Sequence, residues 1–362
     1  MPVAILLATL AVHVALWPVP SPDLEQFLEP WYRHLADRGL VAGFSEPFGN
    51  YSPPYLYLLG LVTLTEPWLG SASAIKALSV AGSLALGLAV MRLLRVSGAP
   101  NPPMGGLWTP LLPTVAANAV LMSQCDALWV APCLMAVAAS IERRHAAMLA
   151  WDGLGFAVKA QAAFLAPFLF AVLLQRRVSA PHWLIPPAVT VALMIPAALA
   201  GWPVSDLLLK YVNQSSQLPS FVSNASNPWV VLAVLAPAAG KALVPVGFGL
   251  AGAASLWLAW RLRSGIADTP AILRAALLSA LFVPTLLPKM HERYFLLADV
   301  LAFVLALTLR DRRSVAIAIL TSAGSALAIA AYAVQAPWLA IASAIPSGAA
   351  LLLVWRQVSR HG

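Results

Sequence analysis

The stretch Pro288-Lys289-Met290-His291-Glu292-Arg293-Tyr294 places four ionisable side chains within five positions, between two long apolar segments. The segment before it covers residues 275–283, and the segment after it covers residues 295–297 and 300–309. A charged Arg or Lys inside a bilayer costs roughly 2.5–3.5 kcal/mol on insertion scales, so such groups are rare there. The stretch therefore indicates a membrane edge or a polar cavity in a membrane protein, although most clusters of this kind are ordinary charged loops.

The composition indicates the same class of protein. Hydrophobic residues make up 60% of the 362 residues, charged residues make up 10%, and the mean hydropathy is +0.81. Soluble domains carry about 25% charged residues, so we predict an all-α polytopic membrane protein with a single membrane domain over residues 1–362. Residues 1–17 lack a basic start and a cleavage site, and are expected to form a retained first span. The net charge of +8 fits an excess of Arg in cytoplasmic loops; the expected partners include membrane lipids but no nucleic acid.

Arginine clusters between the apolar segments predict the topology. Cytoplasmic loops carry an excess of Lys and Arg, so each cluster is expected to close an outward-to-inward span. The clusters are Arg92/Arg95, Arg143/Arg144, Arg176/Arg177, Arg261/Arg263, Arg310/Arg312/Arg313 and Arg356/Arg360. About twelve spans result, with both termini in the cytoplasm: residues 3–17, 74–95, 107–122, 127–142, 146–160, 162–176, 183–200, 229–262, 270–287, 294–310, 314–334 and 338–356. Residues 229–262 are too many for one span and contain Pro237 and Pro245, so a short lead-in helix is expected there.

The remaining polar residues fall on the opposite, extracytoplasmic side of this topology. They lie in a first loop over residues 18–73 with juxtamembrane helices, a turn at residues 123–126, a smaller loop over residues 201–228, and the stretch 288–294. Ionisable groups at the ends of many helices on one face predict a polar site that opens into a membrane cavity. The smaller loop has hydroxyls and amides that suit a glycan, although polar loops usually face water: Asp206, Tyr211, Asn213, Gln214, Ser215, Ser216 and Gln217.

The first loop begins with a helix-start signal. Ser21 is a suitable N-cap and Pro22 suits the first helical position, so we expect an amphipathic interfacial helix over residues 22–38. Leu24, Phe27, Leu28, Trp31 and Leu35 would form its apolar face. Gly39 would end it. Asp23 in its first turn either complements the helix dipole or acts as a general base at the mouth of the first span.

Two other segments are expected to be interrupted. Pro53 and Pro54 bar a regular helix through residues 52–54, and the aromatic residues around them suit a membrane interface or a sugar. The predicted span 146–160 contains two glycines and ends close to Lys159. Such a broken helix usually lines a buried or water-filled cavity. The alternative is a short helix whose Lys159 side chain extends towards the membrane surface.

Five motifs occur in an order that resembles a known family. They are Asp23-x-x-x-Phe-x-x-Pro-Trp-Tyr, Asn50-Tyr-Ser-Pro-Pro-Tyr-Leu-Tyr, Gln124-x-Asp, Lys159-x-Gln-Ala-x-x-x-x-Pro and Lys289-Met-His-Glu-Arg-Tyr. From about residue 20 to about residue 310, the chain resembles the bacterial GT-C membrane glycosyltransferases. Within them it is most similar to the group described as similar to GPI-anchor mannosyltransferase II. The resemblance implies a GT-C-like bundle and transfer of a sugar, with inversion, from a polyprenyl-phosphate donor on the extracytoplasmic side.

The resemblance also implies roles for individual residues. Asp23 would be the base and Asp126 a second catalytic carboxylate, although the family has Gly-Gln-x-Asp-Ser where this chain has Ser123-Gln124-Cys125-Asp126-Ala127. The residues expected to bind the donor phosphate are Lys159, Lys289, His291 and Arg293. The residues expected to bind the sugar or the acceptor are Glu25, Asn50, Tyr51, Gln124, Gln161, Glu292 and Tyr294. No metal or other cofactor is required, although Asp23, Glu25 and Asp126 could supply hard oxygen ligands to a divalent cation.

These residue types suit the implied chemistry. A lipid phosphate gains negative charge as the glycosidic bond breaks, and stabilising such charge is usually the largest catalytic effect. The planar guanidinium of Arg binds two phosphate oxygens at once. A base that removes the proton of the acceptor hydroxyl contributes roughly 10²–10⁴-fold. The chain has no Gly-rich nucleotide-binding loop, which agrees with a lipid-linked donor.

The predicted function is therefore an inverting glycosyltransferase that moves a hexose, with mannose favoured, to a glycan or lipid-linked acceptor. The expected location is a bacterial inner membrane, with the active site facing outwards. A lipid or glycan transporter or flippase is an alternative, but it would place polar groups on both faces. An O-antigen-type polymerase would need a large Arg-rich late loop, whereas loop 201–228 has only Lys210 as a cation. A non-catalytic scaffold of the same fold is the remaining alternative.

Overall fold

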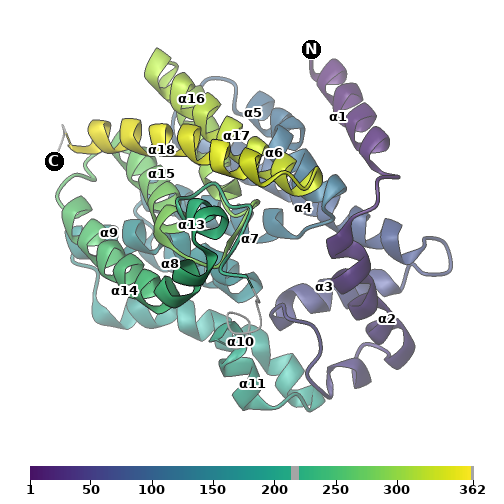
Figure 1. The fold of residues 1–362 in the computed structure, drawn as a ribbon. Coiled ribbons are helices and arrows are strands. Elements are labelled where there is room, and N and C mark those ends of the chain that lie inside the picture. The colour runs from purple at the N-terminus through teal and green to yellow at the C-terminus, as the bar shows by residue number, and fades with distance from the viewer. Residues whose placement is uncertain (213–219, 360–362) are drawn as a thin grey trace.

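The protein is almost entirely helical (Figure 1). The computed structural model describes residues 1–212 and 220–359 and is 78% helical. In these residues, 6 helices are long and apolar enough to cross a membrane. They are α4 (Ser71–Val96), the continuous helix of η6 (Ala180–Leu184) and α10 (Ile185–Ala200), α14 (Pro237–Leu262), α15 (Thr269–Leu286), α17 (Arg312–Ala333) and α18 (Pro337–Ser359). The nearly all-α architecture agrees with the prediction, and the long apolar helices are compatible with an integral membrane protein.

Four further apolar helices are shorter, so the count of twelve spans is not confirmed. They are α1 (Pro2–Leu16), α7 (Asp126–Ile141), η5 (Ala160–Leu165) with α9 (Ala166–Gln175), and α16 (Leu296–Leu309). Crossing the hydrocarbon core takes about 20 helical residues, at 1.5 Å per residue. Each of these helices has 10–17 residues, which corresponds to at most about 25 Å.

Four short helices replace the single span that was predicted at residues 107–122. They are α5 (Pro102–Trp108), η3 (Thr109–Leu111), α6 (Pro113–Ala116) and the π-helix η4 (Ala117–Leu121). Pro110 and Pro113 lack the N–H that a continuous helix needs, and their rings clash with the preceding turn. The segment therefore bends where a straight span was expected.

Two other interruptions agree with the predictions. A short helix, α13 (Trp229–Leu235), precedes α14, as expected for residues 229–262. Helix α8 (His145–Val158) stops before Lys159, whose backbone is extended, with φ −158° and ψ 134°. The break after α8 turns Lys159 and the residues that follow it towards the interior of the bundle.

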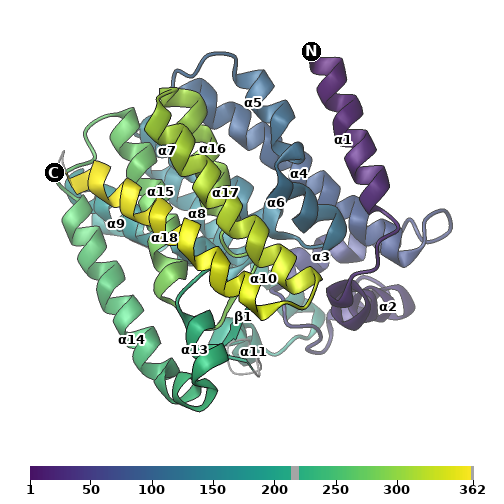
Figure 2. The same cartoon turned by 45° about the horizontal axis from the view of Figure 1, so that its top comes forward.

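Helix α7 lies at the centre of the bundle. Most of its side chains are buried, and it packs against α4, α8, α15 and α16. The outer helices α10, α14 and α18 bury only 17%, 22% and 28% of their most apolar segments, and they lie on the outside of the bundle (Figure 2). Leu199, Trp257 and Trp260 are among their exposed side chains. Since lipid tails are themselves apolar, such faces are stable when they contact a bilayer.

The first loop is folded into helices. These are η1 (Leu24–Leu28), a π-helical turn, then α2 (Glu29–Arg38), η2 (Ala42–Phe44) and α3 (Pro53–Thr63). The predicted helix over residues 22–38 is confirmed, and it ends at Gly39 with φ 82°. Leu28 and Leu35 are buried, whereas Phe27 is 44% exposed although it was predicted on the same face. The π-helical turn changes the angular spacing of its side chains, which an α-helical pattern does not include.

Pro53 and Pro54 are the first residues of α3. Proline is tolerated there because the first N–H groups of a helix have no intrahelical partner. The helix does not pass through Ser52, as expected, but it starts immediately after it. Tyr55 is fully buried, so this one aromatic side chain of the segment contacts the protein interior.

A two-stranded parallel sheet joins the smaller loop to the stretch 288–294. Strand β1 (Val222–Ser223) pairs with β2 (Met290–His291), with Val222 opposite Met290 and Ser223 opposite His291. The Lys289 N–H also donates to the Phe221 carbonyl at 2.7 Å. Earlier in this loop, α11 (Val204–Leu208) contains Asp206. The predicted glycan contacts of Asn213, Gln214, Ser215, Ser216 and Gln217 fall outside the described residues.

Charged residues gather at the two ends of α7. Asp126 is its first residue, and Glu142 caps its far end. The two are separated by about 24 Å along the helix, at 1.5 Å per residue. Glu142 pairs with Arg92 and lies 3.8 Å from Arg144, while Arg176 donates to the Ser140 carbonyl at 2.6 Å. Three of the predicted arginine clusters therefore meet at one end of α7, and Asp126 lies at the other.

Candidate active site

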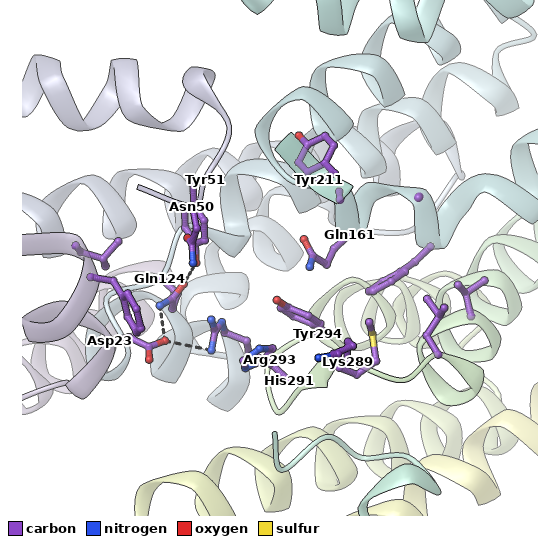
Figure 3. Close-up of a pocket in the computed structure, with 18 of the residues that line it drawn as sticks. Asp23, Asn50, Tyr51, Gln124, Gln161, Tyr211, Lys289, His291, Arg293 and Tyr294 are labelled. Carbon is purple, nitrogen blue, oxygen red and sulfur yellow. Dashed lines mark hydrogen bonds and ion pairs between the residues drawn. The ribbon is translucent and has the colours of Figure 1, made fainter. Parts of the chain in front are cut away.

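A pocket of about 310 Å³ lies at the Asp126 end of the bundle (Figure 3). Nine of the thirteen residues predicted for the site line it, namely Asp23, Asn50, Tyr51, Gln124, Gln161, Lys289, His291, Arg293 and Tyr294. Its other lining side chains are mainly apolar or aromatic, and include Phe27, Leu28, Trp31, Phe164, Phe248, Val283 and Leu287. Segments far apart in the sequence thus enclose one cavity with a polar wall and an apolar wall.

Two contacts fix the chain just before Asp23. Lys76, buried in α4, donates to the Trp17 carbonyl at 2.6 Å and so holds the end of α1. Ser21 Oγ donates to the Met122 carbonyl at 3.2 Å, which ties the helix start to the turn before α7. The position of Asp23 therefore depends on α4 and on the 123–126 turn.

The Asp23 carboxylate is anchored at both oxygens. Gln124 Nε2 donates to Oδ2 at 2.7 Å, and Arg293 Nη1 lies 3.2 Å from the same oxygen. Tyr332 donates its hydroxyl to Oδ1 at 3.2 Å. The side chain is still 17% exposed and faces the pocket, between Gln124 and Arg293 (Figure 3). A small molecule in the pocket can therefore reach this carboxylate.

Both polar atoms of the Gln124 side-chain amide are hydrogen-bonded to other side chains. Its Oε1 accepts from the Tyr51 hydroxyl at 2.7 Å, while its Nε2 donates to Asp23. Lys159 Nζ in turn donates to the Tyr51 hydroxyl at 3.4 Å. Gln124 lines the pocket as predicted, but in this arrangement its amide joins Tyr51 to Asp23 instead of pointing to a ligand.

Asp126 and Lys159 form a buried ion pair next to the pocket. Their side chains are 0% and 2% exposed, and Lys159 Nζ donates to Asp126 Oδ1. Trp129 Nε1 donates to the same oxygen at 2.8 Å, and Asn118 Nδ2 donates to Oδ2 at 2.7 Å. Neither member of the pair is part of the pocket lining. The alternative in which Lys159 extends to the membrane surface is therefore wrong, because Asp126 attracts it inwards.

Arg293 lies among three carboxylates. Its Nη1 donates to Glu292 Oε1 at 2.6 Å, and its Nε lies 3.4 Å from Asp126 Oδ2, in addition to the contact with Asp23. Burial lowers the pKa of Arg293, but Glu292 and Asp23 outweigh this effect and hold that pKa above its usual value. Burial raises the pKa of Glu292 against the opposing effect of Arg293. Glu292 is fully buried beside Arg293 and does not line the pocket.

His291 and Lys289 line the pocket together with Arg293, as the sequence predicted. Burial, and then the positive charges of Arg293 and Lys159, hold the pKa of His291 well below its usual value. His291 is therefore a neutral imidazole at neutral pH and offers a single N–H. Lys289 lines the pocket with a left-handed backbone, φ 63°, which directs the start of β2. Positive charge in the pocket wall thus comes from Arg293 and Lys289.

Two amide oxygens in the pocket wall are available for a ligand. Asn50 Oδ1 and Gln161 Oε1 are buried, and neither has a hydrogen-bond partner within residues 1–212 and 220–359. A buried polar atom without a partner costs free energy, so these oxygens favour a ligand with hydroxyl donors. The ring of Trp31 stands edge-on to Tyr51 at 5.2 Å and adds a flat apolar surface. Hydroxyl donors combined with an apolar face are properties of a sugar ring.

Glu25 does not join the other predicted residues. It is exposed and outside the pocket, because two positions after Asp23 the helix has turned to its opposite side. Among the described residues, no group of three His, Cys, Asp or Glu side chains is arranged to hold a metal ion. Asp126 is instead paired with Lys159 and Arg293.

Three residues of the site were not predicted from the sequence. Asn118 and Trp129 donate to Asp126, and Tyr332 donates to Asp23. Trp129 lies one helical turn after Asp126, which is a signal that could have been used. Asn118 sits in a π-helix, and Tyr332 is 309 residues from Asp23; nothing local in the sequence relates either of them to its partner.

Comparison of the sequence with models of protein families and with curated proteins finds no match. The resemblance to the GT-C membrane glycosyltransferases therefore remains a prediction from the five motifs.

Proposed function

We propose that this protein is an inverting glycosyltransferase that uses a polyprenyl-phosphate hexose and acts on the extracytoplasmic face of a bacterial inner membrane. The proposal includes a GT-C-like bundle of about twelve membrane segments, some of them short or broken, with both termini in the cytoplasm. The observation that carries it is the pocket in which the partly exposed Asp23 carboxylate lies 3.2 Å from Arg293. A base and a phosphate-binding cation thereby share one cavity.

The proposed reaction assigns one role to each wall of the pocket. Asp23 takes the proton of the acceptor hydroxyl as its oxygen attacks the anomeric carbon and the bond from that carbon to the phosphate oxygen breaks. Arg293 and Lys289 stabilise the negative charge that develops on the departing lipid phosphate. Neutral His291 donates one hydrogen bond. Asn50 accepts from sugar hydroxyls, and Gln161 does the same.

The apolar wall supports a lipid-linked donor. Phe248 of α14, Val283 of α15 and Leu287, which follows α15, line the pocket. Helix α14 buries only 22% of its most apolar segment, so the apolar wall adjoins a helix with an outward-facing surface. Phe27, 44% exposed, adds an apolar side chain from the first loop. An isoprenoid chain would be stabilised on these surfaces by roughly 25 cal/mol per Å² of buried apolar area.

Asp126 is proposed as a positioning residue instead of a second catalytic one. Its carboxylate is sealed from the pocket and receives donors from three side chains. In this role it holds Lys159, which contacts the Tyr51 hydroxyl and lies 4.9 Å from the Tyr51 ring centre. The Tyr51 hydroxyl donates to Gln124, and Gln124 donates to Asp23. The position of Tyr51 therefore affects the position of Asp23.

A transfer assay with purified protein in nanodiscs tests the proposal. The donors would be a panel of radiolabelled polyprenyl-phosphate sugars, and the acceptor would be a lipid extract of the source membrane. Wild type is expected to transfer at least one sugar, and Asp23→Asn is expected to lose roughly 10²–10⁴-fold of that rate. Asp37→Asn changes an exposed acid of α2 and is expected to leave the rate unchanged. No transfer by folded wild type with any donor would refute the proposal, and transport of the same lipids would then be measured.

A further inference from the structure

Among the described residues of the C-terminal helices, Tyr332 is the one that donates a hydrogen bond to Asp23. It lies in the last turn of α17, and its hydroxyl donates to Asp23 Oδ1 at 3.2 Å. The turn that follows α17 is fixed by Gln335, whose Nε2 donates to the Tyr332 carbonyl at 2.7 Å. The tyrosine is only partly buried and does not line the pocket. It therefore reaches the carboxylate without competing with a ligand.

The two oxygens of Asp23 have different environments. Oδ2 receives the hydrogen bond of Gln124 and lies beside Arg293. Within the described residues, Oδ1 has Tyr332 as its only hydrogen-bond donor. Oδ1 is thus further from the cationic side of the site, and keeps a lone pair for the proton of a hydroxyl group.

We infer that Tyr332 is a positioning residue for Asp23, one that orients the Oδ1 atom of the carboxylate. This inference rests on the proposed function, in which Asp23 is the base. Without the phenol hydroxyl, the contacts of the carboxylate with Gln124 and Arg293 at Oδ2 remain, and the carboxylate can rotate about them. The base is then less often in the reactive orientation.

Tyr332→Phe removes the donor and keeps the ring. At neutral pH, kcat is expected to fall roughly tenfold because the base is less often in the reactive orientation, and the KM for the donor is expected to stay within about twofold. Tyr57→Phe is the matched control. The Tyr57 hydroxyl accepts from the Ala197 N–H at 2.9 Å, outside the pocket, so this variant should lose stability without changing kcat.

Two results would overturn the inference. In the first, folded Tyr332→Phe has the kcat of wild type. In the second, Tyr332→Phe and Tyr57→Phe lower kcat alike, which would indicate a structural role alone. If wild type transfers no sugar, the proposed function itself fails, and a thermal-unfolding cycle of Tyr332→Phe and Asp23→Ala then decides whether the two side chains interact at all. Additive effects would refute the contact, and non-additive effects would retain Tyr332 as the residue that orients Asp23.

Discussion

Replacing Asp126 by Asn should destabilise this protein more than almost any other single charge removal. Asp126 and Lys159 are 0% and 2% exposed, and Arg293 lies 3.4 Å from the same carboxylate. Removing one partner of a buried pair leaves a buried charge without compensation and costs about 3–5 kcal/mol. The new amide also points an N–H₂ group at donors, since Asn118 and Trp129 both donate to this carboxylate.

The loss of stability expected for Asp126→Asn can be measured by thermal unfolding in detergent. At about 2 °C per kcal/mol, the value for large domains, Asp126→Asn should lower the midpoint by about 6–10 °C. Glu142→Gln at the other end of α7 is the matched control. It breaks a pair with Arg92 in which the two side chains are 27% and 33% exposed. Such pairs are worth at most about 1 kcal/mol, so this midpoint should fall by about 2 °C or less.

A double variant tests whether the loss of stability comes from the unpaired charge of Lys159 or from altered packing around residue 126. In Asp126→Asn/Lys159→Met both charges are gone, and an apolar replacement of a buried pair is often neutral or stabilising. The double variant should therefore regain at least half of the lost midpoint. The reasoning is refuted if Asp126→Asn is as mild as Glu142→Gln, or if the double variant is no more stable than Asp126→Asn.

Three further changes have defined outcomes. Arg293→Lys replaces a two-pronged donor by a point charge, so binding of a radiolabelled polyprenyl-phosphate sugar in nanodiscs should weaken about tenfold; unchanged affinity would contradict a role on the phosphate. Burial lowers the pKa of Lys210 to about 8. Between that value and the higher pKa of an unfolded lysine, the unfolded chain binds more protons, so stability should rise with pH. The thermal midpoint of wild type, compared with that of Lys210→Met, should therefore rise between about pH 7 and about pH 9.5. If the two midpoints change with pH in the same way, the lowered pKa of Lys210 is disproved. In Gly324→Ala the new Cβ would lie 2.0 Å from Ser347 Oγ of α18, whereas at Gly348 a Cβ meets nothing within 4 Å. Gly324→Ala should thus cost about 1–3 kcal/mol and Gly348→Ala nearly nothing; equal thermal midpoints would contradict this.

Much of the helical organisation follows from the sequence because its causes are local. Apolar runs predicted the long helices, and the prolines in residues 229–262 predicted the division into α13 and α14. Gly39 ends α2 as expected. Other prolines explain an error: Pro110 and Pro113 break a segment that was predicted as one span. The predicted number of twelve spans is not confirmed, because four apolar helices are shorter than a bilayer requires.

The membership of the pocket was also largely predictable, whereas the partners of each residue were not. Asp23 and Asp126 are both aspartates in motifs that were predicted to form the site. Asp23 is 17% exposed, whereas Asp126 is sealed from the pocket. This difference arises from Lys159 and Asn118, which lie on other segments and both donate to Asp126. A motif identifies residue types and their order; it does not contain the distances that decide which group meets a ligand.

The wide sequence separation of the site residues has a consequence for how the protein is made. Asp126 and Lys159 are 33 residues apart, so their pair can form as soon as α7 and α8 have left the ribosome. Asp23 must wait for Tyr332, which is synthesised 309 residues after it. During membrane insertion the sealed ion pair can therefore assemble early, while the carboxylate that faces the pocket keeps an incomplete set of partners. A nascent chain that stops before α17 would contain every residue that lines the cavity but not the Tyr332 hydroxyl that contacts Asp23, so this contact forms only when synthesis is nearly complete.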